Sequence, residues 1–360
     1  MERKIYIDHL RLFCIVLLFP YHAAMAWNCW GEGNYIILGA NPFISSFIVA
    51  VSPWYMTLLF VLAGISTKYS LQTRSYRQHI KERIYKLLLP LLTGTFVIIP
   101  VMTYIADKVN CGYTGNYFSH YIIFFRKWTD LTGYDGGFSI GHLWFLLYLF
   151  IISLISIGII IIQKKYTPIL KIKDKNVFTI IFLCLVVMMF IPIKLAGKSI
   201  VTYLFLYLLG YYIFSEEETF VKLQKFQFFY IIIFIISTII NIYLFLWSDT
   251  KYNLINTIAM YFSGTFGILT FLCLGKSLLN KSNKITKKLT EYSFLIYIFH
   301  FIYIVIFENI FNILGLNLYI VLFISVIAAF IATYITCILV SKVPILEFLF
   351  GFRRKRSNKK

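Results

Sequence analysis

Apolar segments long enough to cross a lipid bilayer recur from one end of this 360-residue chain to the other. We place ten of them, at residues 10–30, 44–67, 87–106, 142–162, 177–193, 199–214, 228–247, 255–275, 291–311 and 318–340. A helix of about 20 apolar residues matches the hydrocarbon core of a bilayer and satisfies its own backbone hydrogen bonds there. The sequence therefore predicts an all-α fold, a polytopic bundle of about ten transmembrane helices.

The composition separates this chain from soluble proteins, because 60% of its residues are hydrophobic and only 14% are charged. A formal charge of +19 is also found among nucleic-acid-binding proteins. Here, however, the basic residues lie in short segments between apolar runs, where they set topology and face anionic lipid headgroups. We expect a multi-pass protein of the cell membrane, with the lipid bilayer as a partner and no nucleic acid.

The distribution of basic residues predicts the orientation. With the N-terminus in the cytoplasm, 27 Lys and Arg residues lie inside and 6 lie outside, so both termini are expected to be cytoplasmic. We expect a transmembrane domain over residues 1–345 and a basic cytoplasmic tail over 346–360, which holds the run Arg353–Arg356. The fifth and sixth spans are short and are separated by Lys194–Lys198, so an alternative is one fused or re-entrant segment.

Two ionisable residues lie in the first span, Arg11 and His22. Eleven helical steps of about 100° bring both side chains to one face, roughly 16 Å apart along the axis. Ionisable groups at membrane depth are expensive and usually functional, so we expect this face to line an aqueous or substrate-filled cavity. The alternative is that Arg11 only reaches the headgroups while His22 bonds a neighbouring helix.

Six further positions carry reactive or charged groups near the ends or middles of spans: Arg83, Lys86, His142, Trp144, His300 and Glu308. Each also has a structural alternative. The pair His142 and Trp144 is typical of a helix end anchored at the membrane interface. His300 could be a histidine that only packs against neighbouring helices. Glu308 lies near an outer helix end, where it could reach water. The two basic residues before Pro90 also fit a topology signal.

No phosphate-binding loop, dinucleotide fingerprint, HExxH or GxSxG motif occurs, and the six cysteines have no metal-ligand spacing. We therefore expect no metal site and no bound cofactor. Histidine suits proton abstraction from a hydroxyl near neutral pH. Cations at the cytoplasmic entrance, Arg83 and Lys86, suit a phosphorylated ligand. This combination points to group transfer from a donor such as acyl-coenzyme A, which would be a co-substrate.

Read together, these residues resemble the acyltransferase-3 superfamily of integral-membrane acyltransferases, over essentially the whole chain. Its first-span signature is similar to Tyr6–Arg11 followed by His22. Phe60–Gly64 resembles a Phe-rich Ser-Gly segment, with Ala63 where serine is usual. Arg83–Pro90 resembles an Arg-x-x-Arg motif before Leu-Pro, with Lys86 where the second arginine is usual. A lysine keeps the positive charge there but cannot make the bidentate contact that an arginine makes with a phosphate.

Two later segments extend the resemblance. Gly141–Leu146 is similar to the subgroup that contains the glucan succinyltransferases, and Ser293–His300 to a late Tyr-x-x-His span of the family. The resemblance implies about ten helices, an acyl donor taken from the cytoplasm and a sugar hydroxyl as a frequent acceptor on the outer side, as in O-acetylation of envelope polysaccharides.

The resemblance also implies roles for residues. It assigns catalysis to His22 and Arg11, and donor binding to Arg83 and Lys86. The expected substrate-binding residues are Asp8, His142, Trp144, His300 and Glu308. His22 would either deprotonate the attacking hydroxyl or carry the acyl group itself.

The expected protein is thus an O-acyltransferase that moves an acetyl or succinyl type of group to a surface carbohydrate or glycolipid. The alternative from another class is a secondary transporter or exporter of a glycan or lipid-linked precursor, which buried charges fit equally well. A sensor or structural membrane protein would leave the shared face of Arg11 and His22 unexplained.

Overall fold

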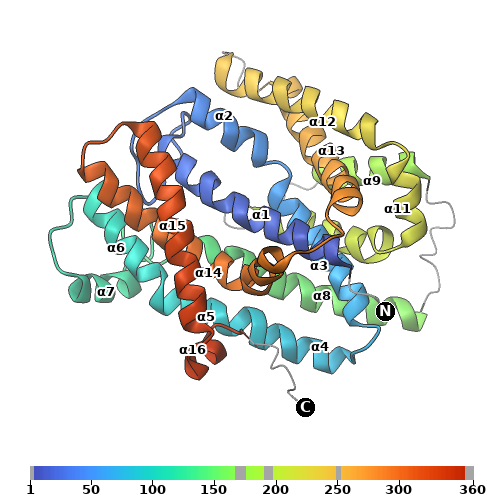
Figure 1. Cartoon of the computed structure of the whole chain (residues 1–360), viewed down its shortest axis with the longest axis horizontal. Coiled ribbons are helices and arrows are strands. Elements are labelled where there is room, and N and C mark those ends of the chain that lie inside the picture. Colours follow the sequence, from blue (N-terminus) through green and yellow to red (C-terminus); the bar gives the residue numbers. More distant parts are fainter. Residues whose placement is uncertain (1–3, 167–175, 190–197, 249–252, 353–360) are drawn as a thin grey trace. The chain divides into compact units, whose positions relative to one another are not determined.

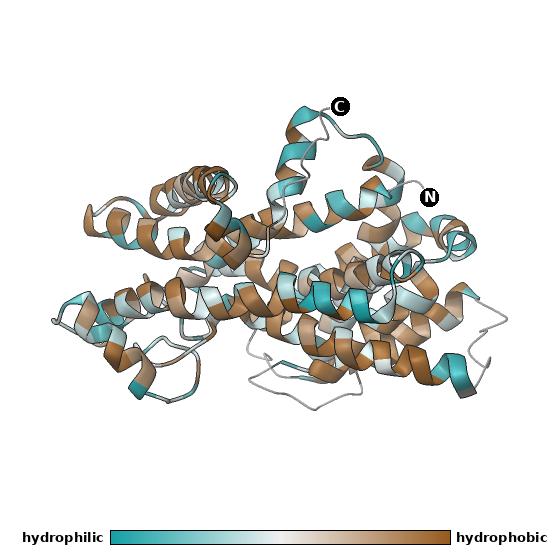
Figure 2. Ribbon diagram, turned by 90° about the horizontal axis from the view of Figure 1, so that it is seen from below, coloured by the Kyte–Doolittle hydropathy of each residue, from teal (hydrophilic) through white to brown (hydrophobic). Residues whose placement is uncertain are grey.

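The computed structural model describes residues 4–166, 176–189, 198–248 and 253–352, and its regular elements there are helices (Figure 1). Eight helical stretches are long and apolar enough to cross a membrane. They run over Ile5–Trp27, Pro42–Ser70, Tyr76–Asn110, Gly141–Lys165, Gln227–Trp247, Leu254–Leu278, Lys284–Ile313 and Leu318–Val340. The all-α, polytopic prediction is confirmed, and Figure 2 shows that these long helices are mostly hydrophobic along their length.

The fifth and sixth predicted spans correspond to two short helical segments, Val177–Met189 and Ile200–Phe214. Both are shorter than the eight helical stretches above. The intervening residues 190–197 lie outside the described residues, as does the basic run from Arg353, so the fused or re-entrant alternative stays open.

By its internal contacts the chain divides into two compact units. The first unit comprises residues 1–14, 45–80 and 151–290, and the second comprises 15–44, 81–150 and 291–360. The first unit holds the start of α1 (Ile5–Ala24), most of α2 (Pro42–Val51), α3 (Tyr55–Ser70), most of α4 (Tyr76–Arg83), the end of α8 (Trp144–Tyr166), α9 (Val177–Met189), α10 (Ile200–Leu209), α11 (Glu217–Gln224), α12 (Gln227–Ile242) and α13 (Leu254–Leu278).

Glycine contacts hold the first unit together where helices cross. A Cβ added to Gly64 of α3 would lie 1.9 Å from the Tyr207 carbonyl oxygen, and one added to Gly210 would lie 2.2 Å from the Val61 carbonyl oxygen. The backbones of α3 and of the segment Ile200–Phe214 therefore touch directly, as small residues permit in membrane bundles. Thr67 and Tyr207 add a hydroxyl–hydroxyl hydrogen bond of 2.6 Å at the same crossing.

The second unit is built from the end of α1 and from the C-terminal helices. It also contains α5 (Leu89–Val97), α6 (Ile99–Asn110), α7 (Tyr117–Arg126), the start of α8, most of α14 (Lys284–Ile313), α15 (Leu318–Val340) and α16 (Pro344–Leu349). α14 is tied to α15 by hydrogen bonds between Tyr303 and Thr336 (2.6 Å) and between Tyr292 and Ser341 (3.2 Å). Phe19 packs on Phe330 of α15 with ring centroids 5.3 Å apart.

A π-helical turn, Ile84–Leu88, joins α4 to α5. Pro90 lacks an N–H and its ring would crowd the carbonyl of Lys86 in a regular α-helix, so the wider turn relieves that conflict. Gly351 has φ +62°, and a Cβ there would lie 2.8 Å from both Pro90 Cγ and the Tyr85 carbonyl oxygen. The chain after α16 thus packs against this turn, and only glycine allows the approach.

Candidate active site

Three histidines from distant parts of the sequence meet in the second unit. His22 lies near the end of α1, His142 lies in a short 3₁₀ turn (Gly141–Leu143) before α8, and His300 lies in the middle of α14. The His300 ring centroid is 5.2 Å from that of His22 and 5.1 Å from that of His142. We call these three residues the histidine cluster; the sequence marked each of them as a candidate.

The backbone fixes which nitrogen carries the proton in two of these rings. His142 Nε2 donates to the Ile298 carbonyl oxygen (2.9 Å), and His300 Nδ1 donates to the Tyr297 carbonyl oxygen (2.6 Å). The opposite nitrogens, His142 Nδ1 and His300 Nε2, are buried and have no hydrogen-bond partner among the described residues. In the neutral tautomer each presents a lone pair, so both are available to accept a proton or a hydrogen bond.

Aromatic rings surround the cluster. Phe301 stacks on His22, with centroids 4.0 Å apart and planes 23° from parallel, and Phe19 meets His300 edge-on at 5.6 Å. Tyr297 donates its phenolic hydrogen to the His142 carbonyl oxygen. Tyr35 meets Phe301 edge-on at 5.4 Å. His22 itself remains partly exposed, whereas His300 and His142 are buried, 0% and 5% exposed.

The buried stripe of α14 explains why His300 faces inward. Tyr297, His300, Phe301, Ile304 and Glu308 recur at three- and four-residue intervals, which lie on one side of a helix. Glu308 is 1% exposed and its Oε1 has no partner within the described parts of the chain. The expectation that this carboxyl group could simply reach water is therefore wrong.

Two partners of Arg11 lie in the first unit. Its guanidinium donates to Asp8 Oδ1 (3.1 Å) and to Ser66 Oγ of α3 (2.8 Å). Asp8, predicted to bind substrate, thus holds the guanidinium of Arg11, and a direct substrate contact stays a prediction. Arg11 and His22 lie on one continuous helix, as the sequence predicted, and His9 of that helix bonds the Leu279 carbonyl oxygen (2.9 Å).

Three other predicted residues, Arg83, Lys86 and Trp144, are not part of the histidine cluster. Arg83 ends α4 and Lys86 lies in the π-helical turn, where it pairs with Glu82 at 3.8 Å across about half-exposed side chains. Trp144 begins α8 and meets Tyr148 edge-on at 5.3 Å. The donor and acceptor roles of these residues remain predictions.

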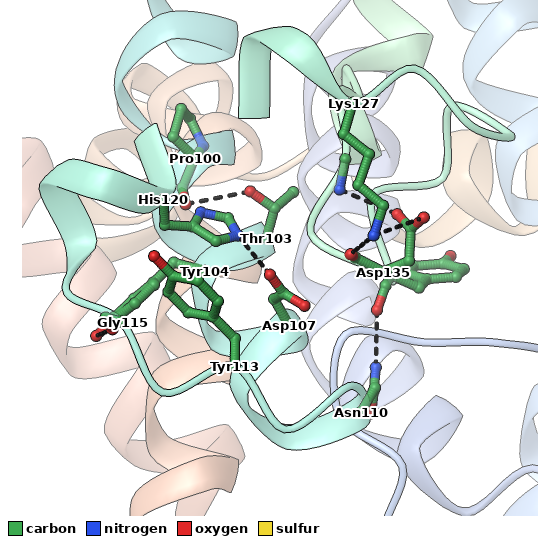
Figure 3. A network of polar contacts seen from close by, with 12 residues as sticks. Pro100, Thr103, Tyr104, Asp107, Asn110, Tyr113, Gly115, His120, Lys127 and Asp135 are labelled. Carbon is green, nitrogen blue, oxygen red and sulfur yellow. Dashed lines mark hydrogen bonds and ion pairs between the residues drawn. The ribbon is translucent and has the colours of Figure 1, made fainter. Parts of the chain in front are cut away.

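Reasoning from the sequence missed a polar network in the segment before His142 (Figure 3). His120 of α7 lies with Nε2 3.2 Å from Asp107 Oδ2 of α6, and Tyr104 and Tyr113 meet its ring edge-on at 5.4 and 5.2 Å. Burial lowers the pKa of His120, and the Asp107 carboxylate opposes that shift. His120 gave no signal in the sequence because it lies in a segment predicted as a loop and its acidic partner lies thirteen residues earlier.

The same network orders the residues that lead into the histidine cluster. Lys127 pairs with Asp135 (3.2 Å), and Asn110 Nδ2 donates to the Tyr134 carbonyl oxygen (3.1 Å) and to that of Asn34 (3.0 Å). At its end Gly141 has φ +49°, and a Cβ there would lie 2.8 Å from the Tyr35 hydroxyl. The turn that carries His142 therefore requires glycine at its start.

Comparison with known protein families gives one match. A family model described as an acyltransferase domain matches residues 4–342. No curated protein and no solved structure gives a significant match. Within the described ranges, no three His, Cys, Asp or Glu side chains are placed to hold a metal ion.

Proposed function

Because this chain belongs to the acyltransferase-3 family and is a membrane acyltransferase, we propose that it transfers a short acyl group from a cytoplasmic acyl-coenzyme A to a carbohydrate hydroxyl. The group is of the acetyl or succinyl type, and the acceptor is a cell-surface carbohydrate or glycolipid at the cell membrane. The observation that carries the proposal is the histidine cluster, in which the His300 ring neighbours both other rings. Two of its ring nitrogens have no hydrogen-bond partner among the residues that the structure describes.

His22 is the proposed general base. In the direct version it removes the hydroxyl proton while the hydroxyl oxygen attacks the thioester carbonyl carbon, the C–S bond breaks, and the leaving thiolate takes the proton back. In the two-step version a His22 nitrogen displaces the thiolate, and the acceptor hydroxyl then displaces the imidazole. The stack on Phe301 and the tilted contact with the His300 ring hold the His22 ring in place in both versions.

The remaining residues take the roles expected from the sequence. His300 and His142 accept hydrogen bonds from the acceptor through their unpartnered nitrogens, and Trp144 provides an aromatic face for a sugar ring. Glu308 and Asp8 complete the substrate-binding set. The cations Arg83 and Lys86 are the proposed contacts for the phosphates of the donor. Arg11, held by Asp8 and Ser66, keeps its expected catalytic role.

The test is covalent transfer by the purified chain in sealed vesicles. Radiolabelled acyl-coenzyme A is supplied on the side of the membrane that the chain termini face. The label is expected to appear in an oligosaccharide acceptor. Movement of the acceptor across the vesicle wall without acylation would instead indicate a transporter. Heat-inactivated protein measures the uncatalysed background.

Donor binding gives a separate prediction. Arg83→Ala is expected to raise the apparent KM for acyl-coenzyme A about ten-fold, because a charge-assisted phosphate contact is lost. Arg77→Ala is the matched control, since Arg77 is an exposed cation of the same helix. Steady-state kinetics over a donor series measures both. An unchanged KM for Arg83→Ala would remove the donor role of this residue.

A further inference from the structure

Two lysines of the first unit lie over tyrosine rings at neighbouring helix ends. Lys68 Nζ of α3 lies 4.9 Å from the ring centroid of Tyr211, and Lys164 Nζ of α8 lies 5.5 Å from that of Tyr76 of α4. The two ammonium groups are close enough to repel each other. We call Lys68, Lys164, Tyr76 and Tyr211 the lysine–tyrosine cluster.

Lys68 and Lys164 differ from neighbouring lysines in having no acidic partner within the described parts of the chain. Lys4 and Lys276 share Glu217, and Lys222 pairs with Glu218 at 2.9 Å. Among the described residues no carboxylate lies within 4.0 Å of Lys68 or Lys164. The tyrosine faces attract the ammonium groups but do not neutralise their two positive charges.

A shielded phenolic hydroxyl group, on the half-buried side chain of Tyr76, completes the cluster. Tyr76 Oη is shielded from solvent and has no hydrogen-bond partner in the described part of the chain. A buried hydroxyl without a partner is unfavourable, and this one can donate to an anion beside the two lysines.

The surrounding contacts keep these groups in place. Tyr211 packs edge-on against Tyr212 (centroids 4.8 Å apart), and the Tyr212 hydroxyl donates to Gln163, the residue before Lys164. The Lys68 helix is locked to Tyr207 through Thr67 and Gly64. A site built on such fixed elements loses little conformational entropy when a ligand binds.

We propose that the lysine–tyrosine cluster binds a phosphate ester, with Lys68 and Lys164 supplying charge and Tyr76 a hydrogen bond. Lys68, Tyr76 and Lys164 lie in the segments 68–86 and 163–175, which the basic-residue distribution predicts to be cytoplasmic. Tyr211 lies near the end of the predicted span 199–214 that precedes another such segment, 215–227. Either an acyl-coenzyme A phosphate or the headgroup of an anionic phospholipid carries the required chemistry. The assignment to the donor rests on the proposed function, whereas phosphate binding does not.

The experiment uses the full chain in detergent and measures calorimetric binding of coenzyme A, and, separately, retention of phosphatidylglycerol over phosphatidylcholine by native mass spectrometry. Lys68→Gln and Lys164→Gln are each expected to weaken coenzyme A binding about ten-fold. Tyr76→Phe is expected to weaken it less. Lys222→Gln, a cation already paired with Glu218, is the control and should bind as the wild type does.

The outcomes separate the two ligands and the two proposals. Loss of coenzyme A binding supports a donor site, and loss of phosphatidylglycerol retention alone supports a lipid headgroup site. Unchanged binding of both ligands in correctly folded variants overturns the inference, even if the wild type is an active acyltransferase. Conversely, coenzyme A bound through these lysines by a wild type that transfers no acyl group contradicts the proposed function and leaves the site standing. Lys164 is exposed, so its replacement tests the site without disturbing the core.

Discussion

Single hydrogen bonds decide what the histidine cluster can do. A backbone carbonyl holds one nitrogen of His142 and one of His300, so the opposite nitrogen of each neutral ring is a lone pair. The two tautomers are opposite, Nε2–H in His142 and Nδ1–H in His300. Both free nitrogens are therefore acceptors, which suits the recognition of hydroxyl groups, whereas removal of the hydroxyl proton is the proposed role of His22.

His120 gives a pH-dependence at the residue scale. Its folded pKa lies below the unfolded value of 6.5 because the ring is buried. Between the two values the unfolded chain binds more protons, so the stability that this ring supports is fully present above pH 6.5 and is lost as pH falls through the folded pKa. Asp107 and Lys127 are the charged groups that act on it, and Tyr104 and Tyr113 pack on it.

Hydrogen–deuterium exchange of residues 117–141 between pH 5 and 8 measures this effect. After correction for intrinsic rates, protection is expected to fall on acidification in the wild type and to be flat in His120→Asn. Protection that does not change with pH in the wild type would contradict the account of His120.

At the scale of elements, the crossing of α3 with α10 depends on Gly64. In Gly64→Ala the new Cβ would meet a backbone carbonyl at 1.9 Å, so the helices must separate. We expect a loss of about 2 kcal/mol or more of stability, as for other overpacked sites. Gly158→Ala of α8 is the control, since nothing lies within 4 Å of its Cβ and alanine favours a helix. Thermal unfolding in detergent compares them; equal stabilities would refute the close crossing.

Long elements could be read from the sequence, because apolar length alone defines a membrane helix. The predicted span 318–340 coincides with α15, and 255–275 lies inside α13. The short helices could not be predicted from the sequence. α7 (Tyr117–Arg126) and α16 (Pro344–Leu349) lie in segments without a spanning pattern, and they depend on tertiary contacts such as Thr93 Oγ1 to the Leu349 carbonyl oxygen (3.0 Å).

For the candidate site, the sequence identified side chains but not their neighbours. His22, His142 and His300 were predictable because an ionisable group at membrane depth needs a reason to be there. That the three rings lie close together was not predictable, because it depends on how α1, α14 and the turn before α8 pack. For the same reason the Ser66 contact of Arg11 and the stack of Phe301 on His22 left no trace in local sequence.

At the scale of the whole molecule, the orientation is testable through a native cysteine. Cys111 is exposed and lies in the predicted outer segment 107–141. In a variant that retains only this cysteine, an impermeant maleimide is expected to label intact cells. A cysteine placed instead at Arg74, in the predicted cytoplasmic segment 68–86, should react only after permeabilisation. The reverse pattern would invert the topology and put the donor site on the wrong side.

The central claim is that His22 takes part in acyl transfer, and its replacement tests this most directly. His22→Ala, purified and shown to be folded, is to be compared with His9→Gln, a histidine of the same helix that bonds a backbone carbonyl. The account predicts that transfer of radiolabelled acyl groups from acyl-coenzyme A falls by roughly 10²-fold or more in His22→Ala, the usual contribution of a general base, and persists in His9→Gln. Transfer at the wild-type rate by His22→Ala would contradict it.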